Sequence, residues 1–406
     1  MKFSTAFRSA DILIPNCSDM KKWSVVACDQ YTSEPEYWQE ADRYVGDAPS
    51  SLRLVLPEVY IGKPDAAARI EKINRTIDSY LNSGIFKEYK DSMICLERRQ
   101  SNGKVRRGIV GAIDLEEYDY RPGSRSQIRA TEATVAERIP ARLEIRKNAK
   151  IELPHTMILI DDPEDSVIGG VFGEKGVVYS FDLMGGGGSV KGSLLSEKEI
   201  SAVDAALAKL REKSEMLFAV GDGNHSLAAA KEHYERLKRE NPGRDLSNHP
   251  ARYALCEIVN LHSEALEFEA IHRIVRVPDQ YNLIMEMSLA LGLSGISSEQ
   301  RVRIHRNFTV RELYIREPLS KLSVGSVQAF LDKYISTHGG EIDYIHGDTT
   351  LKRLAAEPGV IGFEFAPIGK DQLFPAVVAD GALPRKTFSM GEAADKRYYL
   401  EARRIV

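Results

Sequence analysis

The chain has 406 residues, of which 43% are hydrophobic and 28% are charged. This composition supplies enough apolar material for a core, so it excludes a globally disordered chain, and the length favours two or three domains. The 55 basic and 59 acidic residues give a formal net charge of −4, which argues against a dedicated nucleic-acid binder.

The four cysteines, Cys17, Cys28, Cys95 and Cys256, are far apart and form no Cys-x-x-Cys pair. That spacing supports neither a disulfide scaffold nor a zinc cluster. We therefore expect reduced thiols and a cytoplasmic protein. The first residues lack the apolar stretch of a signal peptide, and no run reaches about 18 apolar residues, so we expect no membrane partner.

The first part of the chain predicts strands around one long helix. Apolar runs at 12–15 and 23–28 have the character of strands. Residues 66–83 repeat apolar side chains at helical spacing. Asn102-Gly103 separates strand-like runs at 93–98 and 107–113, which predicts a hairpin. The polar loop at 118–127 then predicts a domain boundary.

The middle of the chain alternates between helical and strand-like segments. We expect helices at 134–147, 196–213 and 227–239, and strands at 156–160, 176–181, 216–220 and 253–260. Ser196 and Glu199 predict a capping box. The glycines at 185–188 lack a P-loop's Gly-Lys-Ser/Thr ending, which favours a hairpin tip or lid.

From residue 278, helices and strands continue to alternate up to residue 406. The whole pattern predicts an α/β fold with an α+β tendency and mixed sheets. We expect an N-terminal α/β region at 1–124, a phosphate-binding core at 125–277 and a C-terminal α/β region at 278–406.

The turn at 221–226 is the most informative segment, because it joins an apolar strand to a helix. The first N–H groups of a helix lack intrahelical partners and favour an anion. Gly221 and Gly223 allow close backbone approach, and His225 can donate to a phosphate oxygen. Asp222 can hold Mg²⁺ directly or through water. The alternative is that a carboxylate or amide of this turn merely caps the helix.

Five short segments, in order along nearly the whole chain, resemble motifs of the uncharacterised family called domain of unknown function 1015. Residues 220–227 resemble its Asp-Gly-His-His-Arg signature, and residues 131–134 with Arg142 resemble its His-Glu-Arg-Thr and downstream Asp-Arg-Leu. Residues 383–387 resemble its Met-Pro-Arg-Lys-Ser-Thr. Weaker similarities lie at 27–30 and 271–275. The signature also resembles the phosphate loop of free-serine kinases in the ParB/sulfiredoxin fold group.

The resemblance implies a ParB/sulfiredoxin-like core that transfers phosphate from ATP or ADP to the hydroxyl of a small acid, with free L-serine as the acceptor. It implies that Glu132 is the general base and that Asp222 and His225 are the other two catalytic residues. Asp222 would also bind the Mg²⁺. The nucleotide-binding residues would be Gly221, Gly223, Asn224, Ser226 and Arg142. The substrate-binding residues would be Arg385, Lys386, Thr387, Asp29 and His272.

Three positions depart from the family pattern. Asn224 and Ser226 replace a His and an Arg of the signature, and Thr131 replaces the His before Glu132. The missing Arg removes a bidentate phosphate donor. A member that binds a phosphorylated metabolite without turnover therefore stays open, and so does a nucleotide-dependent regulatory switch.

The other roles of these residues stay open as well. Without the resemblance, Glu132, Arg142 and the pair at 385–386 are ordinary surface charges, and His272 closes a structural hydrogen bond. Neither His-Glu-x-x-His nor Gly-x-Ser-x-Gly occurs, which argues against a zinc hydrolase or a serine-hydrolase elbow. We expect nucleotide and small-molecule partners and no nucleic acid, and we expect Lys386 to reach a cleft formed by Glu132 and Asp222.

Overall fold

The computed structural model describes residues 3–134, 136–171 and 176–406. The chain divides into two compact units. Unit 1 comprises Met1–Ala130, Thr134–Leu266 and Glu392–Val406, and unit 2 comprises Thr131–Ala133 and Glu267–Gly391. The predicted boundaries at 124/125 and 277/278 stay predictions.

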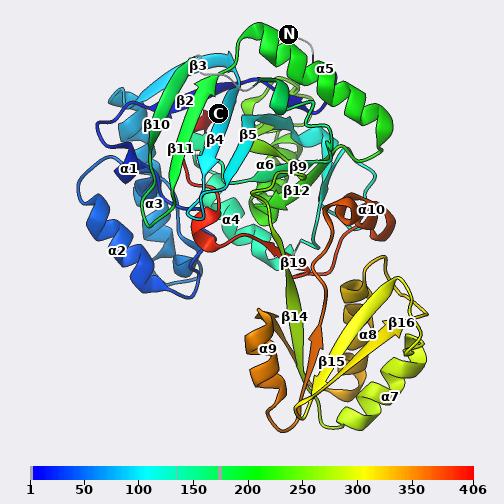
Figure 1. Ribbon diagram of the computed structural model, residues 1–406. Helices are drawn as coiled ribbons and strands as arrows, with labels where there is room; N and C mark the ends of the chain where they lie inside the picture. The colour runs from blue at the N-terminus through cyan, green and yellow to red at the C-terminus, as the bar shows by residue number, and fades with distance from the viewer. Residues whose placement is uncertain (1–2, 135, 172–175) are drawn as a thin grey trace. The chain divides into compact units, whose positions relative to one another are not determined.

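A mixed sheet forms the centre of unit 1 (Figure 1). Its strands are β1 (Phe7–Arg8), β4 (Ile94–Arg99), β5 (Val105–Asp114), β6 (Tyr118–Asp119), β7 (Ile128–Ala130), β9 (Met157–Ile160), β10 (Val177–Asp182), β11 (Ser189–Leu194), β12 (Phe218–Asp222) and β13 (Tyr253–Asn260). The order is β10-β11-β4-β5-β13-β9-β12-β7-β6, with β1 beside β5. Strand β12 runs parallel to β7 and antiparallel to β9, so the expected mixed sheet is confirmed.

Helices and two small sheets complete unit 1. The helices are α1 (Met20–Trp23), α2 (Pro35–Val45), α3 (Ala66–Asn82), α4 (Ile139–Arg146), α5 (Glu197–Lys213) and α6 (Asn224–Glu240). Strand β2 (Ala10–Pro15) pairs with β3 (Phe86–Ser92), and β8 (Ile151–Glu152) pairs with β20 (Arg403–Arg404). The short 3-10 helices are η1 (Ser51–Arg53), η2 (Glu58–Tyr60), η3 (Leu115–Glu117), η4 (Ala136–Arg138), η5 (Gly169–Val171), η6 (Pro250–Arg252) and η7 (Ala393–Asp395).

Both faces of the large sheet are covered by apolar side chains. Along β5, Ile109 and Ile113 belong to one hydrophobic cluster, and the alternating Val110 and Ala112 belong to another. Because successive strand residues point to opposite faces, these clusters lie on the two sides of the sheet. Helices α5 and α6 contribute to the first cluster, and α2 contributes to the second. This burial explains why the central strands read as continuous apolar runs.

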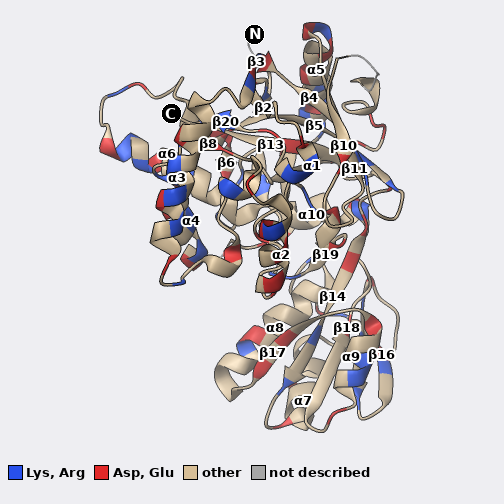
Figure 2. Cartoon of the chain, turned by 90° about the vertical axis from the view of Figure 1, so that its left-hand side faces the viewer, with Lys and Arg blue, Asp and Glu red and all other residues tan. Residues whose placement is uncertain are grey.

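Unit 2 is built on an antiparallel sheet. Its strands are β14 (Phe268–Arg276), β15 (Gln300–Arg306), β16 (Thr309–Ile315), β17 (Glu341–His346), β18 (Val360–Glu364) and β19 (Phe388–Met390), in the order β16-β15-β18-β14-β17 with β19 beside β14. Its helices are α7 (Gln280–Ala290), α8 (Ser323–His338), α9 (Asp348–Ala355) and α10 (Lys370–Asp380). Figure 2 shows basic and acidic residues interspersed along the helices of both units.

Most of the predicted elements are confirmed, including α3, the β4–β5 hairpin, and α5 with its capping box. The glycines at 185–188 connect the antiparallel β10 and β11, as a hairpin tip would. Among the described residues, no helix is long and apolar enough to cross a bilayer.

Three predicted elements differ. Residues 23–28 are not a strand, because their backbone groups make separate hydrogen bonds to the C-terminal segment instead of a continuous ladder. The Val25 carbonyl accepts from the Tyr399 N–H, and Val26 forms only an isolated bridge. Helix α4 begins at Ile139, with a proline in its first turn; residue 135 of the predicted helix lies outside the described residues. Helix α6 begins at Asn224, three residues before its predicted start.

Candidate functional site

Gly223 makes the junction between β12 and α6. Its φ is +81°, and a Cβ at this position would lie 2.8 Å from the Oγ1 of Thr156. Only glycine meets both conditions without strain. Gly223 is also the N-cap residue, and Asp222 Oδ1 accepts from the Gly223 N–H at 2.9 Å. The alternative that a side chain of this turn caps α6 is therefore wrong.

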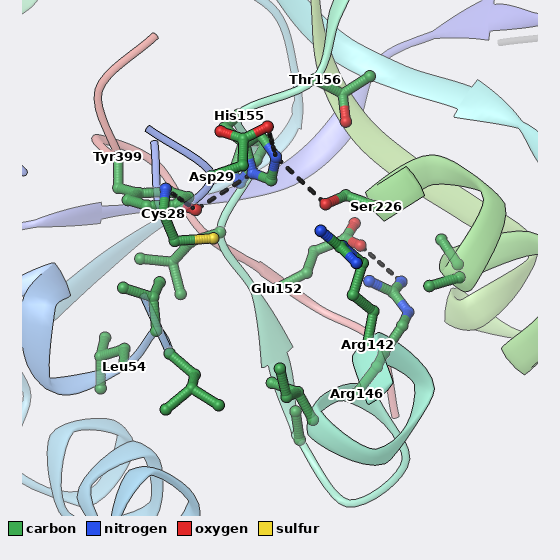
Figure 3. A pocket seen from close by; sticks show the side chains of 18 of the residues that line it. Cys28, Asp29, Leu54, Arg142, Arg146, Glu152, His155, Thr156, Ser226 and Tyr399 are labelled. Carbon is green, nitrogen blue, oxygen red and sulfur yellow. Dashed lines mark hydrogen bonds and ion pairs between the residues drawn. The ribbon is translucent and has the colours of Figure 1, made fainter. Parts of the chain in front are cut away.

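A cavity of about 150 Å³ lies in unit 1 beside the start of α6 (Figure 3). In Figure 3 Cys28, Asp29, Tyr399 and Ser226 lie around His155, and Arg142, Arg146 and Glu152 form a second polar group below Ser226. Leu54 lies away from both groups among other hydrocarbon side chains. The polar residues of the lining are Cys28, Asp29, Glu58, Arg142, Arg146, Glu152, His155, Thr156, Ser226 and Tyr399.

His155 is the centre of the polar group. Its Nδ1 lies 3.2 Å from Tyr399 Oη, and that oxygen already accepts from the Cys28 N–H at 3.1 Å. The tyrosine proton is thus directed at Nδ1. The other nitrogen, Nε2, lies 3.1 Å from Ser226 Oγ and 3.7 Å from Asp29 Oδ2. A neighbouring carboxylate favours a proton on Nε2, so we assign His155 as donor and Ser226 as acceptor. That arrangement does not activate Ser226 as a nucleophile.

The electrostatic surroundings of α6's first turn favour an anion. Burial, together with the positive charges of Arg142 and Arg138, lowers the pKa of His225 to about 4, so its ring is neutral at pH 7. Burial also lowers the pKa of Arg142. Burial would raise the pKa of Asp29, but His155, a hydrogen bond from Gln30 and the charge of Lys396 lower it overall. Helix N-termini add a partial positive charge of their own.

Two cations next to the turn already have protein partners. Arg142 donates to the Arg138 carbonyl at 3.0 Å and pairs with Glu58. Lys396 Nζ lies 3.4 Å from Asp222 Oδ2.

The fit of Mg²⁺ at Asp222 depends on these contacts. One carboxylate oxygen accepts from the Gly223 N–H and the other contacts Lys396. Among the described residues, no group of three or more His, Cys, Asp or Glu could hold a metal ion. Asp222 as it stands therefore does not fit a direct Mg²⁺ ligand, and a divalent cation would have to compete with Lys396.

Asn224, at the first position of α6, carries a buried Oδ1 for which the described part of the chain provides no hydrogen-bond partner. An amide can exchange its oxygen and nitrogen by rotating about its last torsion, which would present a donor at the same place. A ligand with either kind of polar group could satisfy this position.

Glu132 and the segment at 385–387 come together within unit 2. The two carboxylate oxygens of Glu132 accept from the Lys386 and Thr387 N–H groups, each at 3.2 Å, and Glu132 also bridges to Leu383. Burial raises the pKa of Glu132, and this effect outweighs the two N–H groups and the charge of Lys386. Lys386 has a φ of +58°, which directs consecutive N–H groups to one carboxylate.

Two further predicted substrate residues have partners inside unit 2. Arg385 Nε donates to Tyr344 Oη at 2.9 Å. His272 Nε2 pairs with Asp348 Oδ1 at 2.9 Å, while its Nδ1 accepts from the Phe365 N–H at 3.3 Å. Both ring nitrogens of His272 therefore have hydrogen-bond partners within the protein. This agrees with the structural role that the sequence left open as the alternative to substrate binding.

The predicted site residues fall into the two units. Unit 1 holds Asp29, Arg142, Gly221, Asp222, Gly223, Asn224, His225 and Ser226, and unit 2 holds Glu132, His272, Arg385, Lys386 and Thr387. The cleft predicted to join Glu132, Asp222 and Lys386 stays a prediction.

Three residues of the site were not predicted from the sequence: His155, Tyr399 and Lys396. Antiparallel pairing places Met157 opposite Asp222, so the residues just before β9 lie beside the start of α6. This pairing is the signal that could have identified His155. Tyr399 and Lys396 reach the site from the C-terminal segment of unit 1, and no sequence pattern marks them.

Comparisons with solved structures find distant similarities. A free serine kinase in complex with AMP is 12% identical, with a TM-score of 0.40, covering 72% of this chain and 90% of the other. A mutant free serine kinase in complex with ADP is 11% identical, with a TM-score of 0.40, covering 73% and 92%. A conserved hypothetical protein from Pyrococcus furiosus is 11% identical, with a TM-score of 0.36, covering 70% and 90%.

These TM-scores lie below 0.5, so the similarities assign no function to this chain. The search of curated proteins finds no match. The model of a family described as "Protein of unknown function (DUF1015)" matches residues 14–317, which is more than half of the chain. The chain belongs to the DUF1015 family.

Proposed function

We propose that this chain binds a nucleotide with its phosphates at the start of α6 and transfers a phosphoryl group to the hydroxyl of a small acid. The observation that carries the proposal is that two arginines act on the first turn of α6: burial, followed by the charges of Arg142 and Arg138, lowers the pKa of His225 to about 4. Phosphoryl transfer needs mainly such positioning and charge neutralisation.

The first turn of α6 would bind the phosphates through its backbone N–H groups. Gly223 allows the left-handed backbone turn that leads from β12 into this helix, and Arg142 adds a cation in the lining of the adjoining cavity. His225, neutral at pH 7, can donate one ring N–H to a phosphate oxygen. Ser226, placed by its contact with His155, offers a hydroxyl in place of the family's arginine. ATP and ADP are both candidate donors.

Glu132 is the proposed general base. The hydroxyl oxygen of the small acid would form a bond to the terminal phosphorus of the nucleotide, and the hydroxyl proton would pass to the Glu132 carboxylate. The bond between that phosphorus and the oxygen of the remaining nucleotide would break. A raised pKa suits a carboxylate for this role near neutral pH. The step requires Glu132 and the bound nucleotide to share one cleft, which is the expectation drawn from the sequence.

Arg385 and Lys386 are the proposed partners of the acceptor's carboxylate, because a carboxylate that leaves water needs a cation. Free L-serine is the acceptor that the family resemblance implies. Mg²⁺ would neutralise phosphate charge in such a reaction. Asp222 does not offer the cation a direct ligand, because its carboxylate already contacts Lys396.

The test is ³¹P NMR of the chain with Mg²⁺, with ATP and ADP separately, and with a pool of hydroxy acids that includes L-serine. We expect a new phosphomonoester signal that disappears in Glu132→Gln and persists in Glu137→Gln, an exposed carboxylate of η4. An intact nucleotide with every acceptor would refute the kinase proposal.

A second candidate is a binder of phosphorylated metabolites without turnover. The serine at position 226 favours it, because it stands where the family signature has an arginine and a hydroxyl cannot make the bidentate phosphate contact of a guanidinium. This candidate predicts nucleotide or phosphate-ester binding that Glu132→Gln leaves unchanged. A kinase would instead lose turnover in that variant.

A further inference from the structure

The cavity beside α6 has two chemically different ends. One end carries the polar group around His155, with Arg142, Ser226 and Thr156. The other end is lined by aliphatic side chains from α3, α4, β8 and the segment after η1. These aliphatic residues are Leu54, Val55, Leu56, Ile61, Ile73, Ile77, Ile145, Ala149, Ile151 and Leu153.

We infer that this cavity binds a carboxylic acid whose hydrocarbon body, about the size of a benzene ring, occupies the aliphatic end while its acid group meets Arg142 and the start of α6. The whole cavity has a volume of about 150 Å³, which limits its occupant to a small molecule, and an apolar space of about this size admits benzene. Its acid group would meet the same cation and helix start as the nucleotide phosphates of the proposed function. The acid is therefore an alternative occupant of that position and not the phosphoryl acceptor, whose carboxylate is assigned to Arg385 and Lys386.

Arg142 provides the cation for the acid group. Its side chain is 13% exposed, and it contacts Glu58 through Nη2 and the Arg138 carbonyl through Nη1. A guanidinium has five N–H donors, so these two contacts leave capacity for a carboxylate. Ser226 Oγ and Thr156 lie in the same polar lining.

The aliphatic end does not suit the base of a nucleotide. Adenine has an amino group that needs an acceptor, and burying it unpaired is costly. The nearby acceptor Glu152 already accepts from Arg146 at 2.6 Å, Arg403 at 2.9 Å and the Leu255 N–H at 2.8 Å. A hydrocarbon group has no such requirement and gains from burial.

The experiment compares lactate with 3-phenyllactate, which share an acid group and differ by one phenyl ring. Calorimetry and ligand-observed NMR should show that phenyllactate binds roughly ten- to a hundredfold more tightly, as burial of a ring of this size implies. A naphthyl analogue should bind less tightly than phenyllactate, because it exceeds the cavity. Equal affinities for lactate and phenyllactate would overturn the inference.

Ala149→Leu is the matched variant, because Ala149 is buried in the cavity lining. It should abolish the advantage of phenyllactate over lactate and leave lactate binding unchanged. Ala68→Leu, on an exposed position of α3, is the volume control and should change neither. If AMP displaces phenyllactate from the unmodified chain and fails to bind to the Ala149→Leu variant, that result would assign the aliphatic end to the adenine base and overturn the inference. If Ala149→Leu does not fold, the ligand series on the unmodified chain decides.

The two proposals fail separately. Phenyllactate binding without any phosphate transfer would leave this inference standing and refute the kinase. Phosphorylation of serine with no preference for a hydrocarbon body would leave the kinase standing and refute this inference.

Discussion

His225 gives the chain a pH-dependent stability at the scale of a single residue. Its folded-state pKa of about 4 lies below the ordinary value of 6.5. Between these values the unfolded chain binds a proton that the folded chain does not, so stability present above pH 6.5 is lost as the pH falls toward 4. Urea unfolding of His225→Gln should show a smaller loss between pH 7.5 and 4.5 than the unmodified chain; an unchanged loss would contradict this assignment.

Arg397 should be among the most sensitive residues of unit 1. Its guanidinium pairs with Glu257 at 2.5 Å and Glu401 at 2.6 Å, and all three side chains are at most 1% exposed. Arg397→Met would leave buried carboxylates short of a partner, at a cost of about 3–5 kcal/mol in unfolding free energy. Arg404→Met, which removes an exposed pair with Glu88, should cost about 1 kcal/mol or less. Urea unfolding of both variants measures the contrast, and equal costs would refute it.

For single residues, contacts between two recognised motifs could be predicted from the sequence, whereas contacts that depend on the packing of distant segments could not. The family resemblance put Glu132 and residues 385–387 in one group, and the structure joins them by two backbone hydrogen bonds. The partners of His155 were not predictable, because Asp29 and Tyr399 are far from it in sequence. Their contact depends on how the C-terminal segment packs in unit 1.

At the scale of elements, the junction of β12 and α6 depends on Gly223. Gly223→Ala would combine a left-handed φ, which costs about 1–2 kcal/mol, with a Cβ that meets Thr156 at 2.8 Å. Gly243→Ala has a similar φ of +84° but open space around it, so it isolates the backbone strain. We expect Gly223→Ala to cost about 1–3 kcal/mol more, the usual range for overpacking. Thermal unfolding of both variants checks this, and equal losses would contradict the close packing.

Elements with strong local signals were predictable, and those set by distant partners were not. The capping box of α5 and the Asn-Gly turn between β4 and β5 act over a few residues, and both appear as expected. Residues 23–28 have a strand-like composition but bond to residues near 399 instead of forming a ladder. The early start of α6 follows from the left-handed Gly223, which composition alone does not reveal.

At the scale of the whole molecule, the C-terminal 15 residues belong to unit 1 although unit 2 precedes them. They supply β20, which pairs with β8, and Arg397, which pairs with Glu257. A chain ending at residue 391 should therefore lose the structure of unit 1. The fragment 267–391 should fold alone, because the pairs of the unit 2 sheet lie within it. Circular dichroism and NMR of both fragments test this; a folded unit 1 in the truncated chain would contradict it.

The division into two compact units depends on contacts between distant parts of the chain. The boundary that the composition of residues 118–127 predicts stays a prediction, and the chain passes between the two compact units at 130–131, 133–134, 266–267 and 391–392. The tripeptide Thr131–Ala133 belongs to unit 2 because it is hydrogen-bonded to both backbone groups of Leu383. The Thr131 carbonyl accepts from the Leu383 N–H, and the Ala133 N–H donates to the Leu383 carbonyl. Such a contact has no local signature in the sequence.

The most direct test of phosphate binding at the start of α6 is the pKa of His225, followed by NMR with and without ADP. Bound phosphates would add negative charge beside Arg138 and Arg142, so we predict that the pKa of His225 rises well above 4. His233, whose pKa burial also lowers to about 4, lies on the same helix and serves as the control that should not move. If ADP binds and the pKa of His225 stays at its ligand-free value, the phosphates bind elsewhere and the proposed site is wrong.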